Sequence, residues 1–325
     1  MRAIIRKSFG DPGVLTIHDL PAPQAKAGHV LIEVKAFGIN HAETHMRSGD
    51  WPEAAAVSGI ECVGLVRDGG DSRLHRGQKV AALMGGMGRT INGSYAEFTC
   101  PPATNVLPIE TDLQWEEFAA IPESYATAWA CIHGNLELSA GQTLLIRGAT
   151  SALGQAALNI AAHAGANVIA TTRNPTRVAT LEGLGAGHVL LEGPELSKRV
   201  RELQSGGVDC VLELVGNSTL LDSLATVRSG GRLCLAGFLG GLAAMSDFNP
   251  LLQMPSRVHF SFFGSFMLGT PDFPLSDVPL QTIIDRVAAG IYRAEPARVF
   301  RLDEIGEAHR LMESSAANGK LVVRL

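Results

Sequence analysis

The chain has 325 residues, of which 46% are hydrophobic and 18% charged, and its formal net charge is −5. This size and apolar content allow more than one globular core. Without a long apolar stretch or a basic tract, a membrane protein and a nucleic-acid partner are not expected. The five cysteines are scattered and no signal-peptide pattern opens the chain, so we expect a cytoplasmic protein with free thiols.

The first 119 residues have the pattern of a compact β-rich domain. Short apolar or alternating runs are separated by glycine and proline, as in small barrels and sandwiches. The strands expected here are His29–Ile39, Glu61–Val66, Gln78–Leu83 and Ser94–Cys100.

Residues 120–264 alternate between apolar strands and helical spacing, which predicts a parallel sheet with helices on both faces. The helical patterns include Pro175–Leu184 and Ser218–Arg228. The expected strands are Thr143–Arg147, Asn167–Thr171, His188–Leu191, Val208–Val215, Arg232–Ala236 and the unusually apolar His259–Leu268. Residues 265–325 then return to mixed structure: helices at Leu280–Ala289 and Ile305–Met312, and strands at Arg298–Leu302 and the C-terminus. We expect this tail to rejoin the first domain.

A turn of small residues, GATSALG, follows the strand Thr143–Arg147 and precedes a helical run that ends at Gly165. Small residues let a pyrophosphate approach the free N–H groups and positive dipole end of a helix. The loop departs from G-x-G-x-x-G, and a plain tight turn is the alternative interpretation. The position between strand and helix favours a dinucleotide site, with these expected contacts: Gly148, Thr150, Ser151, Ala152, Leu153 and Gly154.

The end of the next strand indicates which dinucleotide binds. NAD enzymes have an acidic residue there for the ribose hydroxyls, but no carboxylate lies between Gly154 and Glu182. The guanidinium fork of arginine suits the 2′-phosphate of NADP. Two arginines, Arg173 and Arg177, follow this strand, and the alternative interpretation is that both are solvated surface charges. We predict NADP(H) as the cofactor, held at this end by Thr172, Arg173, Asn174 and Arg177.

Several segments, in order along nearly the whole chain, resemble the zinc-free quinone oxidoreductase branch of the medium-chain dehydrogenase/reductase superfamily. They are RKSFGDPGVLTI, AFGINHAETHMRSG, SGIECVGLV, AIPESYATAW, RGATSALG and NGKLVVRL. The resemblance implies a GroES-like catalytic domain, a Rossmann doubly wound parallel-sheet domain and a tail that completes the catalytic domain. It also implies a nicotinamide cofactor in the cleft between the two domains. The expected limits are 1–119, 120–264 and 265–325.

The zinc ligands of the related alcohol dehydrogenases are replaced. Asn40 and Ile60 stand where that branch has a cysteine and a histidine, and no cysteine lies between Cys62 and Cys100 for a structural site. An amide and an isoleucine do not supply the deprotonated S or N ligands that zinc needs. An unrelated metal site of His41, Glu43, His45 and Glu61 is a weaker alternative to an ordinary hydrogen-bonded group. No metal is expected.

Without a metal, the chemistry rests on the cofactor and on hydrogen-bond donors that meet the charge growing on the acceptor oxygen. Quinones and conjugated enones spread that charge, whereas a simple ketone gains more from zinc. We therefore expect NADPH-dependent reduction of a quinone or an α,β-unsaturated carbonyl. Two alternatives stay open: an enoyl-thioester reductase, and a non-enzymatic NADPH-binding protein.

Asn40 and Tyr125 are the expected catalytic residues. Asn40 occupies the former metal-ligand position, and Tyr125 begins a helix that faces the cleft in the family. A turn-forming asparagine and a core-edge tyrosine are the alternatives. For Trp51, which the family places near its acceptor pocket, core packing is favoured. The resemblance implies further cofactor contacts, at Val215, Gly216, Gly237, Phe238, Phe263, Asn318 and Lys320.

An apolar edge strand rich in aromatic residues must be covered. In the family two such strands pair across a twofold axis, so we expect a homodimer through Val258–Leu268. Burial against a neighbouring helix is the alternative.

Overall fold

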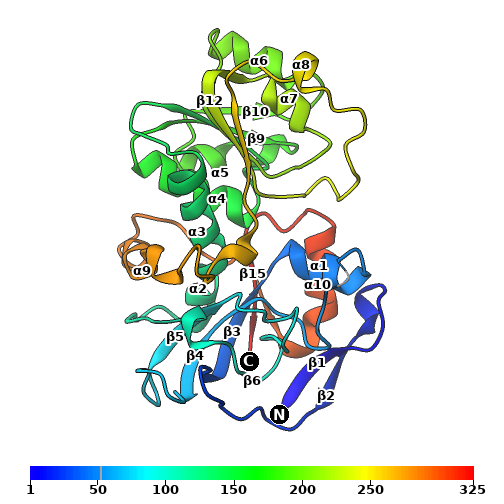
Figure 1. Ribbon diagram of the computed structural model, residues 1–325, viewed down its shortest axis with the longest axis vertical. Helices are drawn as coiled ribbons and strands as arrows, with labels where there is room; N and C mark the ends of the chain where they lie inside the picture. Colours follow the sequence, from blue (N-terminus) through cyan, green and yellow to red (C-terminus); the bar gives the residue numbers. More distant parts are fainter. Residues whose placement is uncertain (52) are drawn as a thin grey trace. The chain divides into compact units, whose positions relative to one another are not determined.

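The computed structural model describes residues 1–51 and 53–325, which form two compact units (Figure 1). The first unit consists of residues 1–126 and 265–325, and the second of residues 127–264. The second unit is thus inserted in the sequence of the first. Helix α3 (Pro122–Trp129) carries the chain from one unit into the other.

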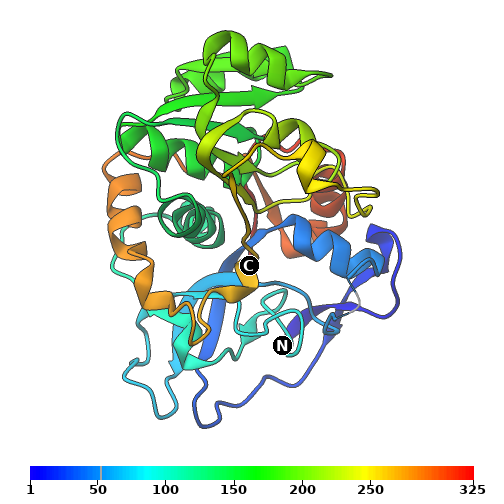
Figure 2. The same ribbon diagram turned by 45° about the horizontal axis from the view of Figure 1, so that its top comes forward.

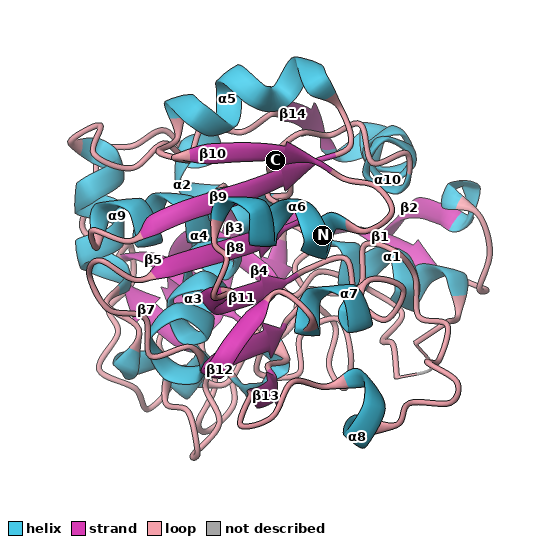
Figure 3. Cartoon of the chain, turned by 90° about the horizontal axis from the view of Figure 1, so that it is seen from above, coloured by secondary structure: helices cyan, strands magenta, loops and turns pink. Residues whose placement is uncertain are grey.

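The second unit is built on a parallel sheet of six strands in the order β10-β9-β8-β11-β12-β13, which lie side by side in Figure 3. The order reverses direction between β8 and β11, as in doubly wound dinucleotide-binding sheets. The strands are β8 (Thr143–Arg147), β9 (Asn167–Thr172), β10 (His188–Leu191), β11 (Val208–Glu213), β12 (Val227–Leu235) and β13 (His259–Phe262).

Helices cover both faces of this sheet. On one face Leu145 and Val211 pack in a single core with Val200 of α6 and Leu224 of α7. On the other, α4 contacts β8 and β9, and a π-helix (Ala130–Asn135) contacts β12. The helices are α4 (Ala152–His163), α5 (Val178–Gly183), α6 (Leu196–Leu203), α7 (Leu220–Leu224) and the short α8 (Pro250–Gln253).

The first unit contains a mostly antiparallel sheet in the order β14-β15-β3-β4-β5-β7, with β6 paired to β3, and a separate hairpin β1-β2. The C-terminal strand β15 lies between β14 and β3, so the tail completes the N-terminal sheet. The strands are β1 (Arg2–Arg6), β2 (Leu15–Asp19), β3 (Leu31–Ile39), β4 (Glu61–Asp68), β5 (Lys79–Leu83), β6 (Phe98–Thr99), β7 (Val106–Pro108), β14 (Arg298–Arg301) and β15 (Leu321–Arg324).

Four more helices complete the first unit. α10 packs against α1, and the two run beside each other in Figures 1 and 2. Apolar residues of α10, such as Ile305 and Met312, share one core with β3 and β15. These helices are α1 (His41–Ser48), α2 (Trp115–Ala119), α9 (Leu280–Ala288) and α10 (Ile305–Glu313).

Three elements differ from the sequence-based prediction. The strand expected at His259–Leu268 ends at Phe262, and after Gly264 the chain turns into a 3-10 helix. The strand expected at Ser94–Cys100 is reduced to Phe98–Thr99, with one isolated bridge beside it. The helix expected at Ser218–Arg228 is short, because β12 already begins at Val227 and crosses the Gly230–Gly231 pair with a shift of register.

Within the described part of the chain, no helix has both the length and the apolar character needed to cross a bilayer.

Candidate functional site

The loop between β8 and α4 has the shape expected of a dinucleotide-binding turn. Gly148 has a φ of +80°, and a Cβ at Gly154 would lie 2.6 Å from the Gly148 carbonyl oxygen, so both positions require glycine. Ser151 is the N-cap: its hydroxyl donates to the Gly148 carbonyl and accepts from the Gly154 N–H. That hydroxyl is therefore engaged within the loop.

The first turn of α4 presents N–H groups that have no partner in their own helix, including those of Ala152 and Leu153. The Gln155 amide donates to the Thr150 carbonyl at 3.0 Å and holds the loop against the helix. Because α4 has twelve residues, its dipole favours an anion at this end. The loop can thus hold a phosphate group by backbone contacts alone.

A buried arginine that the sequence analysis did not single out ties this loop to its neighbours. Arg147, the last residue of β8, donates from Nε and Nη2 to both oxygens of Glu192, at 3.1 and 2.7 Å. Its Nη1 donates to Asp222 at 2.9 Å and to the hydroxyl of Ser223 at 3.1 Å. Burial lowers the pKa of Arg147, but the carboxylates around it outweigh that effect and raise it. One guanidinium therefore joins the ends of β8 and β10 to α7.

Glu192 lies beside the end of β9, where the sequence analysis expected no acidic residue. Its backbone N–H donates to the Thr172 carbonyl at 2.8 Å, and its carboxylate accepts from the Thr171 hydroxyl at 2.6 Å. An acidic residue thus lies next to the end of β9, although none is present in the segment that follows that strand. It was missed because it follows the next strand along the chain, β10. Its two oxygens already accept from Arg147 and Thr171.

The four residues expected at the NADP phosphate lie between the last residue of β9, Thr172, and the end of the 3-10 helix that follows it. Thr172 and Asn174 hydrogen-bond to each other, and Asn174 caps the 3-10 helix Pro175–Arg177. Arg173 is exposed and Arg177 is half-buried. The turn therefore carries two bases and no acid.

At the ends of β11 and β12, the buried Glu213 accepts hydrogen bonds from the N–H groups of Val215 and Gly216, at 2.7 and 3.0 Å. Burial raises its pKa. A Cβ at Gly237 would lie 2.7 Å from the Leu214 carbonyl oxygen, so this backbone approach also requires glycine. Of the two expected aromatic contacts, Phe238 is half-buried and Phe263 is buried.

In the first unit, Asn40 and Lys320 lie together in a buried charge cluster with Glu61. Lys320 Nζ is 2.5 Å from Glu61 Oε1 and donates to Asn40 Oδ1 at 2.5 Å, while Asn40 Nδ2 donates to the same Glu61 oxygen at 3.1 Å. Glu123 Oε2 is 3.8 Å from the ammonium. Burial lowers the pKa of Lys320, but Glu61 and Glu123 reverse this and raise it. The lysine therefore remains charged inside the unit.

Glu43 completes the cluster from the first turn of α1. Its two oxygens accept from the N–H groups of Asn40 and Ile60, at 2.6 and 3.1 Å. The side chain is fully buried, and this burial raises its pKa from 4.5 to about 8 in spite of those hydrogen bonds. Glu43 therefore takes up a proton more readily than an ordinary glutamate, beside the ion pair of Lys320 and Glu61.

The other expected residues of the first unit lie in different surroundings. Tyr125 is buried, donates to the Arg293 carbonyl at 3.2 Å and stacks on Tyr292. Burial raises the pKa of its hydroxyl. Trp51 faces the guanidinium of Arg89. The structure therefore brings Asn40 and Lys320 together but does not join Tyr125 to them by any recorded contact of the described residues.

Asn318 has a left-handed backbone with φ +53°. Its Oδ1 is buried and has no hydrogen-bond partner among the described residues. A buried carbonyl oxygen of this kind needs a water or a ligand as its partner.

His41, His45, Glu43 and Glu61 do not converge on a common point. Glu43 and Glu61 bind the backbone and Lys320, and His45 lies 3.6 Å from Asp50. Among residues 1–51 and 53–325, no group of three histidine, cysteine or acidic side chains is arranged to hold a metal ion.

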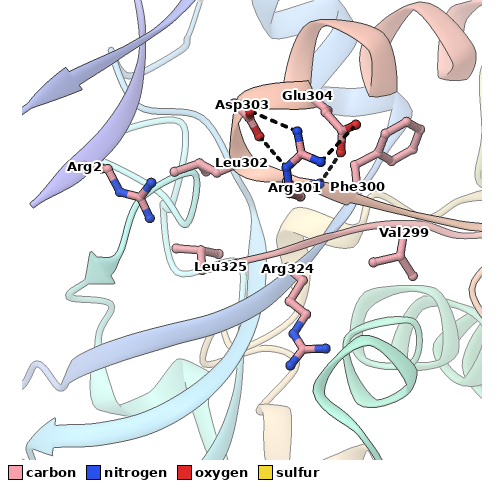
Figure 4. Close-up of a pocket in the computed structure, with 9 residues that line it drawn as sticks. All are labelled: Arg2, Val299, Phe300, Arg301, Leu302, Asp303, Glu304, Arg324 and Leu325. Atoms are coloured by element: carbon pink, nitrogen blue, oxygen red, sulfur yellow. Dashed lines mark hydrogen bonds and ion pairs between the residues drawn. The ribbon is translucent and has the colours of Figure 1, made fainter.

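A pocket of about 670 Å³ lies elsewhere in the first unit, between β14, β15 and the N-terminal strand (Figure 4). Three arginines line it, but each already has a carboxylate partner: Arg2 with Glu97, Arg301 with Asp303 and Arg324 with Glu116. None of the predicted site residues lines this pocket.

Two sequence models of known families match the chain. The model described as alcohol dehydrogenase GroES-like domain matches residues 26–111, and the one described as zinc-binding dehydrogenase matches residues 152–280. The quinone oxidoreductase of Lama guanicoe is 28% identical over 334 residues, which cover the whole of this chain and 98% of the relative.

One component of the phenolphthiocerol/phthiocerol polyketide synthase of Mycobacterium tuberculosis is 29% identical over 340 residues. That match covers all of this chain and 15% of the synthase component. The chain is also similar to the structure of mycobacterial Rv1454c complexed with NADPH, with a TM-score of 0.89 and 26% identity. That match covers the whole of this chain and the whole of the Rv1454c chain.

Proposed function

We propose that this protein is a zinc-independent, NADPH-dependent reductase of quinones or α,β-unsaturated carbonyls. The premise is that the chain belongs to the quinone oxidoreductase branch of the medium-chain dehydrogenase/reductase superfamily. The observation that carries the proposal is the surroundings of Asn40. In this chain an amide stands at the position where the zinc-dependent branch has a cysteine, and a lysine ammonium rather than a cation-binding set of ligands lies against it. Those side chains suit hydrogen-bond donation and not metal binding.

The residues of the second unit fit a bound NADP(H). Glycines 148 and 154 leave the helix N-terminus open, and the turn after β9 offers Arg173 and Arg177 without an acid. The unpartnered Oδ1 of Asn318 in the first unit is a further acceptor that a ligand can satisfy. Rv1454c, which matches this chain over its whole length, has been seen with NADPH. When bound, this cofactor supplies the hydride.

The protein contributes orientation and donors. Asn40 uses one of its two amide hydrogens on Glu61, so the other is available to the acceptor oxygen or to the nicotinamide ribose. A donor already in place when charge develops on the acceptor lowers the barrier without reorganisation. Tyr125, which already donates to a backbone carbonyl, is the weaker candidate of the two.

A second candidate is reduction of an enoyl thioester. The match of the whole of this chain to a segment of a polyketide synthase component favours it. The chemistry at the hydride acceptor is the same, and only the substrate is larger.

We also propose a homodimer formed through β13. This strand is at the edge of its sheet, and it exposes 39% of Phe260 and 51% of Phe262. An uncovered aromatic edge invites pairing with a second copy. Light scattering should give twice the chain mass at micromolar concentration, and a monomer would contradict the proposal.

A cytoplasmic location remains a prediction. It is supported by the free state of all five cysteines.

The test of the function is NADPH oxidation by a simple 1,4-quinone after dialysis against EDTA, with NADH as the comparator. We expect turnover to survive chelation and to prefer NADPH. Arg173→Ala should raise the KM for NADPH by about 10-fold and leave that for NADH unchanged, since it removes a phosphate contact only. Binding of NADPH without turnover of the quinone would move the assignment to the enoyl thioester.

A further inference from the structure

We propose that Lys320 is a positioning residue of this reductase: with Glu61 it fixes the orientation of the Asn40 carboxamide, so that an N–H and not the oxygen is offered to the ligand. The inference rests on the proposed function, in which Asn40 meets the acceptor or the cofactor. It assigns to Lys320 a role through Asn40 in place of the direct cofactor contact that the sequence predicted.

An asparagine carboxamide has two orientations, related by a half-turn, which exchange its oxygen and its NH₂ group. An ammonium only donates hydrogen bonds, and a carboxylate only accepts them. With Oδ1 at 2.5 Å from Lys320 Nζ and Nδ2 at 3.1 Å from Glu61 Oε1, both neighbours are satisfied. The opposite orientation would set the NH₂ group against the ammonium and the oxygen against the carboxylate. The pair therefore selects one orientation.

The selected orientation leaves one donor. Glu61 takes one amide hydrogen, and Glu43 takes the backbone N–H of the same residue. Among the described residues no acceptor is recorded for the second amide hydrogen, and Asn40 is only half-buried. That hydrogen is the part of the amide that a ligand can reach.

The pairing of two strands holds the backbones of Lys320 and Asn40 next to each other. Asn40 directly follows β3 and Lys320 directly precedes β15, and these two strands are antiparallel neighbours in which Ile39 faces Leu321. Glu61 is held in turn by the backbone N–H of Glu123, at 2.9 Å. Two adjacent strand ends and one helix N-terminus thus hold the three side chains.

Gly38 gives the cluster its room. A Cβ at this position would lie 2.3 Å from Lys320 Cε and 2.4 Å from Glu61 Oε1. Gly38→Ala would therefore push the ion pair away from Asn40 without removing any charged group. This provides a second way to disturb the amide.

A buried ion pair is by itself a poor source of stability, because the loss of hydration offsets the attraction. An apolar pair would fill the same space. What Lys320 and Glu61 add is the complementary donor and acceptor that a carboxamide needs to keep one orientation.

The test is a double-mutant cycle on hydride transfer from NADPH to the quinone, with Lys320→Met, Asn40→Ala and the double variant. If Lys320 acts through Asn40, each single variant should lower kcat by on the order of 10- to 100-fold. The double variant should then be no slower than Asn40→Ala. Affinity for NADPH, measured by fluorescence, should stay within about threefold of wild type, and Lys198→Met is the surface control. Losses that multiply in the double variant, or an unchanged kcat in Lys320→Met, would overturn the proposal.

A readout independent of turnover separates this inference from the proposed function. In protein labelled with ¹⁵N at asparagine, the Asn40 amide, assigned by its loss in Asn40→Ala, should give two distinct hydrogens of unequal exchange rate. In Lys320→Met and in Gly38→Ala the hydrogen that is bound to Glu61 should exchange faster, and Lys320→Arg should restore its protection. Should Lys320→Met fail to fold, the Gly38→Ala spectrum decides, and unchanged amide signals there would reject the inference. Wild-type protein that shows the amide signature but reduces neither acceptor class would reject the function alone.

Discussion

Each unit of the molecule contains a buried base among carboxylates, and the two are built differently. Arg147 spreads its donors over Glu192, which follows β10, and over Asp222, Ser223 and the Thr219 carbonyl, which lie in or directly before α7. Lys320 brings its single ammonium to Glu61 and Asn40. The guanidinium of arginine has five N–H donors in a fixed plane and can bind several groups at once. The ammonium of lysine is compact and can orient a single neighbouring group. In our proposal Arg147 supports the loop between β8 and α4, and Lys320 orients one side chain of the proposed reaction site.

The largest expected effect is on stability in the second unit. Arg147→Met leaves the partly buried Glu192 and Asp222 without their base, and breaking such a pair costs about 3–5 kcal/mol. Urea unfolding should show this loss. A cost below 1 kcal/mol, on the order of a surface pair, would contradict the supporting role of Arg147.

Glu43→Gln tests the pH dependence of stability in the cluster around Lys320. This cluster contains a carboxyl, that of Glu43, whose pKa is raised to about 8. The folded protein holds that proton more tightly than the unfolded chain, whose pKa is near 4.5. The contribution of Glu43 is therefore full below pH 4.5 and is lost as the pH rises to about 8.

The free energy of unfolding of the wild type should fall between pH 5 and 8, relative to Glu43→Gln, by on the order of a few kcal/mol. Half-buried His41, whose pKa is lowered to about 4, acts in the opposite direction in both proteins, so the difference isolates Glu43. Parallel pH profiles would show that Glu43 is ionised in the fold.

Arg147→Lys tests whether the fork itself matters. A lysine keeps the charge but cannot bind both oxygens of Glu192 and reach Asp222 together. We expect a loss of about 1–2 kcal/mol, roughly one or two hydrogen bonds to charged groups. If this variant is as stable as the wild type, charge alone explains the site.

The smallest effect is expected at the cap of α4. Ser151→Ala removes one helix cap and should cost about 1 kcal/mol. The affinity for NADPH should change by less than about threefold, because the hydroxyl is occupied within the loop and the backbone N–H groups remain. A large loss of affinity would mean that Ser151 turns toward the phosphate when the cofactor binds.

These two regions also show what the sequence could predict. The loop from Gly148 to Gly154 was predictable because strand, turn and helix are consecutive and each is determined locally. Arg147 and Glu192 were missed because their contact joins the ends of two strands, β8 and β10, that are separated along the chain by α4, β9 and α5. Lys320 was singled out, but its partners Asn40 and Glu61 are about 260 to 280 residues away, and no local pattern connects them.

The predicted strand at His259–Leu268 was too long because it was based on an apolar run. His259–Leu268 is apolar enough for one long strand, but Gly264 interrupts it, and Phe263 and Leu268 are buried outside the sheet. Phe260 and Phe262 remain exposed on the edge strand, so the apolar composition of this segment indicated neither the burial nor the secondary structure of each residue.

The role of Asn40 is tested by single-turnover hydride transfer in Asn40→Ala, preloaded with NADPH and mixed with a saturating 1,4-quinone. We predict normal NADPH binding and a rate of NADPH oxidation at least about 10-fold below wild type, because the oriented donor is lost. A rate equal to that of the wild type, with binding also unchanged, would show that Asn40 does not serve the reaction.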